Sequence, residues 1–168
     1  MQLTRDNYHS REAEREYMSR SQYQGFLECE ARQVARLAGD WVEVPSEALL
    51  VGQYVHAWAE GKADAFKDQH PEMFTKAGKL RASFRQAETM IDTLKRDPLC
   101  LYMLEGQKEV PFVAEFAGAK WRIKVDVYNH ERGRIVDLKT TRSIWDTFWS
   151  EKHGGRVSFI EQYDYLLQ

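Results

Sequence analysis

The sequence lacks several features that would place a protein in a specialised class. Only two of its 168 residues are cysteine, and Cys29 and Cys100 do not form a metal-binding spacing, so both are interpreted as reduced packing residues. No apolar run approaches the roughly 20 residues that span a bilayer. The N-terminus, MQLTRDNYHSREAERE, is too polar for a secretion signal. These absences favour a cytoplasmic protein with no membrane segment.

Charge of one sign is also scarce, because the formal net charge is only -2. A chain this balanced does not by itself indicate a nucleic-acid-binding protein. The distribution is less even, since residues 108–142 contain eight lysines and arginines against five acids. The chain has no internal repeats, and its 43% hydrophobic content is enough for one core. We therefore expect a single domain over residues 1–168, with residues 1–18 as a polar arm.

Helical patterns come first along the chain, and strand patterns follow. Ser21 with Gln24 resembles a capping box, and the helical period that follows ends at Gly39. Four further helices are expected, over 46–61, over 79–97 before Pro98, over 143–152, and from a start near Ser158. In the third of these, Trp145 and Trp149 would share one apolar face. The expected strands are EVPFVAEFAG, AKWRIKVDVYN and RIVDLKT, residues 109–118, 119–129 and 134–140. The order predicts an α+β fold, with N-terminal helices before an antiparallel-to-mixed sheet that is flanked by helices.

Two of the expected strands carry acids. In the middle strand Asp126 alternates with an aliphatic face formed by Trp121, Ile123, Val125 and Val127, and in the next strand Asp137 and Lys139 share a face. Carboxylates on neighbouring strands can converge on a hard divalent cation, which prefers oxygen ligands. A lysine about 7 Å away on the same face could hold a phosphate or position a water. The pattern suits phosphodiester hydrolysis.

At these residues the sequence resembles the PD-(D/E)xK nuclease superfamily, in particular its RecB-like branch and the phage exonuclease VIII-like (RecE-type) members. In VGQYVHAWAEG, Gly52, His56 and Glu60 match the G-x-x-x-H-x-x-x-E setting of a family helix. Asp126 matches the aspartate of the first catalytic strand, and Asp137-Leu138-Lys139 matches the D-x-K of the next. MSRSQYQGFLECEA also looks like the lead-in helix of the exonuclease VIII-like group.

The resemblance implies a restriction-endonuclease-like core and a metal-dependent deoxyribonuclease. It further implies a phage or prophage recombination exonuclease that acts on duplex DNA ends in the cytoplasm of a bacterial host. Mg²⁺ or Mn²⁺ would be held by His56, Asp126, Asp137 and the backbone carbonyl of Leu138, with Lys139 assisting the attacking water. A ring-forming oligomer and a single-strand annealing partner are also implied.

Other residues are weaker candidates. Glu115 could be a further metal ligand, and Thr140 and Thr141 could bond a phosphate. Family members continue into a helix with a Q-x-x-x-Y motif that contacts DNA. Gln162 with Leu166 does not complete this motif, so Gln168 is aligned with the glutamine and the tyrosine falls past the last residue. We therefore expect the C-terminal part of the fold to be missing.

Other interpretations remain open at this point. Asp126 and Asp137 could be surface acids with Lys139 as their ion-pair partner, and His56 and Glu60 could be ordinary helix residues. The chain could also be a catalytically silent nucleic-acid-binding module of the same fold. A third alternative is a CRISPR-associated or AddB-like nuclease with an iron-sulfur cluster, which needs four thiolates where this chain has two.

Overall fold

The protein is α+β, with helices before and after antiparallel strands, as the sequence predicts. The computed structural model describes residues 1–42 and 44–163. The chain divides into two compact units, unit 1 (Met1–Leu138) and unit 2 (Lys139–Gln168). Within the described ranges, none of the helices has the length and apolar character needed to cross a membrane.

Three helices begin unit 1, α1 (Arg11–Glu16), α2 (Arg20–Glu28) and α3 (Glu30–Ala38). The expected single helix from Ser21 to Gly39 is wrong, because the backbone of Cys29 is extended and separates α2 from α3. The capping box uses Ser19 and Gln22 instead of Ser21 and Gln24. Gly39 ends α3 in a left-handed conformation (φ 92°), as its position predicted.

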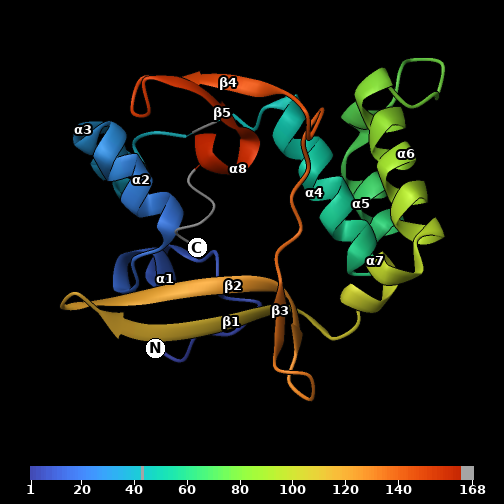
Figure 1. Cartoon of the computed structure of the whole chain (residues 1–168). Helices are drawn as coiled ribbons and strands as arrows, with labels where there is room; N and C mark the ends of the chain where they lie inside the picture. The colour runs from blue at the N-terminus through green and yellow to red at the C-terminus, as the bar shows by residue number, and fades with distance from the viewer. Residues whose placement is uncertain (43, 164–168) are drawn as a thin grey trace. The chain divides into compact units, whose positions relative to one another are not determined.

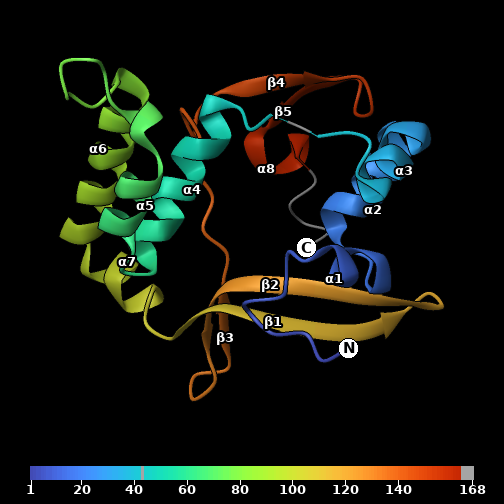
Figure 2. The ribbon, with the colours of Figure 1, turned by 180° about the vertical axis from the view of Figure 1, so that it is seen from behind.

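The helical core of unit 1 is formed by α4 (Glu47–Ala59), α5 (Ala63–Gln69), the 3₁₀ turn η1 (Pro71–Met73), α6 (Ala82–Arg96) and α7 (Pro98–Met103). Helix α4 begins where expected, since the Ser46 side chain accepts a hydrogen bond from the backbone N–H of Leu49. Helices α4 and α6 lie side by side (Figures 1 and 2). The buried side chains of the core are Tyr54, Val55, Met73, Phe84, Ala87 and Ile91.

The sheet of unit 1 has the order β1-β2-β3, with β1 (Gln107–Phe116), β2 (Ala119–Asn129) and β3 (Arg134–Val136) all antiparallel. Strands β1 and β2 form the long hairpin of Figure 1. The expected third strand, 134–140, is too long, because β3 ends at Val136. Beyond it, the backbone N–H of Leu138 donates to the side chain of Asp126 and not to the backbone of β2. Asp137 and Lys139 therefore follow the strand and do not belong to it.

The N-terminal segment covers one side of β2. Arg122 is only 3% exposed, whereas Ile123 is 49% exposed. Along the aliphatic face of β2, Val125 and Val127 are therefore buried whereas Ile123 is not, and on the other face the charged Arg122 is buried. The cause is Tyr8, whose ring lies 4.8 Å from the Arg122 guanidinium and whose carbonyl accepts a hydrogen bond from it. Segment 1–18 thus contains α1 and three buried side chains, Tyr8, Ala13 and Tyr17.

Unit 2 contains a second hairpin, β4 (Thr147–Ser150) and β5 (Gly155–Ser158), followed by α8 (Phe159–Gln162). The helix expected over 143–152 is wrong. Thr147, Phe148 and Trp149 are β-branched or aromatic residues that favour a strand, and Gly154 adopts the left-handed backbone of the turn (φ 61°). Helix α8 begins after Ser158, as expected, with a capping box to Glu161.

Candidate metal centre

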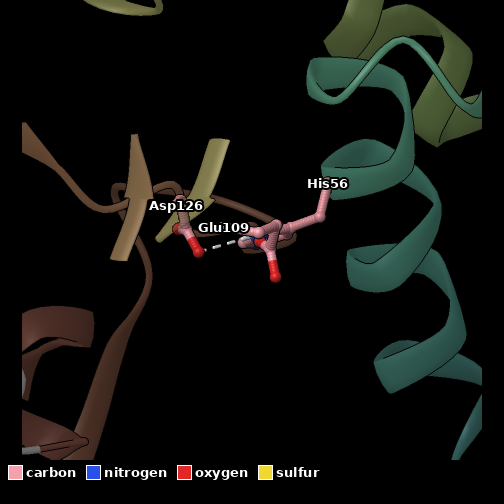
Figure 3. Close-up of side chains that lie close together, drawn as sticks. All are labelled: His56, Glu109 and Asp126. Atoms are coloured by element: carbon pink, nitrogen blue, oxygen red, sulfur yellow. Dashed lines mark ion pairs between the residues drawn. The ribbon is translucent and has the colours of Figure 1, made fainter. Parts of the chain in front are cut away.

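Three side chains from three different elements converge in unit 1 (Figure 3). They are His56 of α4, Glu109 of β1 and Asp126 of β2, and one ligand atom of each lies within 4.8 Å of the others. All three are buried or half-buried, so water screens their charges less than at an open surface. This separation is short enough for one cation to contact all three side chains.

Helix α4 positions His56 through its neighbours in the chain. Tyr54, Val55 and Ala57 are buried and belong to the apolar side of the helix. His56 keeps 27% of its side chain exposed, and its Nδ1 lies 3.4 Å from Oδ1 of Asp126. A packed helix therefore holds the imidazole next to the carboxylate.

Glu109 and Asp126 are cross-strand neighbours. The pairs Lys108↔Val127 and Val110↔Val125 flank them, and the same register places Glu109 opposite Asp126. Glu109 also has a positive φ of 55°, which is uncommon for a residue with a side chain and costs about 1–3 kcal/mol. Strain of this kind is concentrated at functional sites.

The sequence analysis named Glu115, and not Glu109, as the acid of this strand. Glu115 is exposed and pairs with Lys120, six residues and about 20 Å along the strand from Glu109. The sequence does contain a signal for Glu109. In an antiparallel hairpin that turns at Gly118, the residue numbers of every facing pair add to the same total. That rule puts Glu109 across from Asp126.

The segment after β3 is tied to the cluster through Asp126. The backbone N–H of Leu138 donates to Oδ2 of Asp126 at 2.6 Å, and the Leu138 side chain packs against the helical core. Continuing the β2–β3 register past Val127↔Val136 would put Asp137 opposite Asp126. Among the described residues, however, the three-residue cluster does not include Asp137, because the ladder stops at Val136.

A lysine lies beside Glu109. Lys124 Nζ forms a close ion pair with the Glu109 carboxylate and also lies 3.1 Å from Nε2 of His9. Burial, followed by the charges of Lys124 and Arg122, lowers the pKa of His9, so its neutral ring can accept a hydrogen bond from Lys124. The ammonium balances one of the two carboxylates of the cluster.

The donor set fits a divalent cation. Two carboxylates supply the oxygen ligands that Mg²⁺ and Mn²⁺ prefer, and a single imidazole is compatible with Mn²⁺ and other first-row metals. His56, Glu109 and Asp126 are the residues that would hold it. The fit comes from ligand type and spacing, which are observed for all three side chains.

The structure also describes most of the other residues that the sequence predicted for the site. Glu60 ends α4 and forms ion pairs with Arg5 and Lys62. Lys139 and Thr140 are the first residues of unit 2, and Thr141 donates a hydrogen bond to the Ser143 carbonyl. Gln168, which was aligned with the family glutamine, lies outside the described residues. Cys29 and Cys100 are both free thiols.

Comparisons with known proteins identify the family of the chain. Residues 19–168 match a family model described as a PDDEXK-like domain of unknown function (DUF3799). A crystal structure from Eubacterium rectale, described as a candidate exonuclease, is 43% identical in sequence with a TM-score of 0.89. The match covers 98% of this chain but 64% of that protein, so the chain spans about two thirds of its length. A comparison with curated proteins gave no match.

Proposed function

Because this chain belongs to the family of PDDEXK-like domains, as its motifs predicted, we propose that it is a metal-dependent deoxyribonuclease. The observation that carries the proposal is the convergence of His56, Glu109 and Asp126 within 4.8 Å. Two of the three donors, Glu109 and Asp126, lie on a sheet whose next segment provides the D-x-K sequence, Asp137-Leu138-Lys139. The two features together favour phosphodiester hydrolysis over a purely structural acidic cluster.

Each residue has a proposed role. His56, Glu109 and Asp126 would hold Mg²⁺ or Mn²⁺, and Asp137 and the Leu138 carbonyl are the further ligands that the family resemblance implies. A metal held there would polarise the phosphate and lower the pKa of a bound water. Lys139 places a positive charge near the reacting phosphate and orients the water. Lys124 balances the charge of Glu109, since the two form an ion pair.

The finer proposal is an exonuclease that removes nucleotides from DNA ends. It is supported by the description of the Eubacterium rectale protein as a candidate exonuclease. A phage or prophage recombination role, a cytoplasmic location, a ring oligomer and a single-strand annealing partner follow from the resemblance to RecE-type proteins. They are proposals for the whole protein, of which this chain spans part.

The experiment compares linear and covalently closed circular duplex DNA with the purified chain. We expect acid-soluble nucleotides from the linear DNA in Mn²⁺ or Mg²⁺, none in EDTA, and none from the closed circle. Nicking of the circle would show that the protein cuts inside DNA strands, and the proposed activity would then be that of an endonuclease and not of an exonuclease. DNA binding in EDTA with no hydrolysis in any divalent metal would favour the catalytically silent module.

A further inference from the structure

A polar cavity of about 300 Å³ lies between α2 and α3, apart from the metal centre. Its walls include Gly25 and Glu28 of α2, Arg32, Gln33 and Arg36 of α3, and Trp41, which follows α3. This volume is at the small end of the range for ligand sites in proteins. The whole cavity belongs to unit 1.

One buried donor in the cavity wall lacks an acceptor. Gln33 is 5% exposed, and its Nε2 has no hydrogen-bond partner among the residues that the structure describes. The orientation of the amide is fixed, because Arg36 Nε donates to Gln33 Oε1 at 3.2 Å. A buried polar group without a partner destabilises the fold, so Nε2 favours a ligand that brings an acceptor.

Gly25 allows this arrangement. A Cβ at position 25 would lie 2.3 Å from Gln33 Oε1, closer than any real contact. Glycine therefore leaves the space in which the Gln33 amide lies against α2. A larger residue there would have to displace the amide from the cavity wall.

The arginines of the cavity already have acidic partners. Arg32 pairs with Glu28 at 2.6 Å, and Arg36 pairs with Glu14 at 3.2 Å. The cavity therefore does not favour a phosphate, because both arginines are already paired with carboxylates. What remains is a neutral donor, Gln33 Nε2, and the half-exposed indole of Trp41, which lines the same cavity. An aromatic face together with an amide donor suits a flat heterocycle with an acceptor on its edge.

From these contacts we propose that the cavity binds a nucleobase of single-stranded DNA, with the base stacked on Trp41 and bonded by Gln33 Nε2. The proposal rests on the proposed nuclease function and names a substrate contact outside the metal centre. The start of α2 is attached to β2, because the Met18 N–H donates to the Lys120 carbonyl and the Arg122 N–H donates to the Met18 carbonyl. Position 121, opposite Met18, is five residues from Asp126, or about 17 Å along the strand.

The test measures binding without hydrolysis. A short fluorescein-labelled single-stranded oligonucleotide is titrated with protein in EDTA, beside an oligonucleotide of equal length made of abasic sites. Wild-type protein should bind the base-bearing strand more tightly. Because stacking on an aromatic side chain is lost, Trp41→Ala should weaken that binding roughly tenfold and leave the abasic strand unaffected. Trp41→Phe should retain most of the preference.

Matched variants separate the cavity from general effects. Trp145→Ala removes another exposed tryptophan, 86% exposed in unit 2, and should bind like wild type. Gln33→Met removes the donor at similar volume and should reduce the base preference by a smaller factor. Thermal melting checks that each variant is folded, and folding should tolerate replacement of the half-exposed Trp41 better than replacement of the buried Gln33.

The proposal is overturned if folded Trp41→Ala binds the base-bearing strand like wild type. It is equally overturned if wild type binds the two strands alike, or binds neither. Nucleotide release by wild-type protein in Mn²⁺, measured in parallel, reports on the nuclease function separately. If wild type hydrolyses DNA but shows no base preference, only the proposal of base binding in the cavity is rejected. If it shows a base preference but no hydrolysis, the proposed nuclease function is rejected.

Discussion

Glu109 and Asp126 both lie between the strand pairs Lys108↔Val127 and Val110↔Val125, and His56 completes a cluster whose ligand atoms are within 4.8 Å of one another. Two carboxylates this close repel unless a positive charge balances them. Lys124 provides such a charge for Glu109, and His56 Nδ1 lies 3.4 Å from Asp126. A divalent cation would supply more charge at the same place, which makes metal binding the property to test first.

Glu109→Gln should weaken Mn²⁺ binding at least tenfold, because an amide is a poorer ligand than a carboxylate and one charge is lost. Calorimetric titration with Mn²⁺ measures the change. Glu115→Gln is the matched control on the same strand, since Glu115 is exposed and paired with Lys120. Equal Mn²⁺ affinity in the Glu109→Gln and Glu115→Gln variants would show that Glu109 is not a metal ligand.

Asp137→Asn should abolish metal-dependent hydrolysis and leave the protein folded. Asp137 is exposed and follows β3, so its charge can be removed without changing the core. Gel assays of labelled DNA, together with thermal melting, measure both properties. A folded variant that cleaves like wild type would show that the D-x-K segment does not take part.

Lys139→Met should bind Mn²⁺ like wild type, because a lysine is not a metal ligand in this proposal. Folding should survive, since methionine replaces most of the apolar stem. Hydrolysis should fall by about a hundredfold, the usual effect of losing one preorganised group that stabilises transition-state charge. Single-turnover cleavage measures the rate, with exposed Lys152→Met as the control. Lower stability with unchanged turnover would instead assign Lys139 a structural role.

Glu88 should make stability dependent on pH in the acid range. Burial raises the pKa of Glu88, but hydrogen bonds from Tyr54 and Lys67 outweigh it and lower the pKa below its ordinary value of 4.5. The ionised form therefore stabilises the fold above pH 4.5, and this contribution is lost as pH falls through the lower folded value. Glu88→Gln should reduce the free energy of unfolding at pH 7 by about 0.5–1 kcal/mol.

Urea unfolding at pH 7 and at pH 3 measures this difference, which should shrink at the lower pH because wild type then loses the same contribution. Glu131→Gln, at an exposed turn position, should match wild type at both pH values. A Glu88→Gln effect that is equal at pH 3 and pH 7 would contradict the assignment.

Local patterns predicted the α+β class, the start of α4 at Ser46 and the family. The signals are short-range, since a capping serine or a G-x-x-x-H spacing needs only a few residues of sequence. Long-range features were harder to predict. Glu109 enters the cluster through a left-handed backbone, which its residue type does not indicate, and through a register that can be read only when both strands of the hairpin are aligned.

Two further features depart from the local pattern. Trp145 and Trp149 have helical spacing, but the turn at Gly154 pairs β4 with β5 and leaves both tryptophans exposed. Arg122 is a charged residue that the N-terminal segment buries through Tyr8, a contact that the local strand pattern does not contain. In the first case the pairing of a short hairpin overrides the helical spacing, and in the second the contact comes from a segment 114 residues away in the sequence.

The most direct test of the central claim is single-turnover hydrolysis of end-labelled linear DNA in Mn²⁺ by wild type and by Asp126→Asn. Asparagine retains an oxygen that can accept the hydrogen bond from the Leu138 N–H, so the variant should melt like wild type. The proposed metal centre predicts hydrolysis by wild type, none in EDTA, and a rate at least about a hundredfold lower for Asp126→Asn. Hydrolysis at the wild-type rate by folded Asp126→Asn would contradict it.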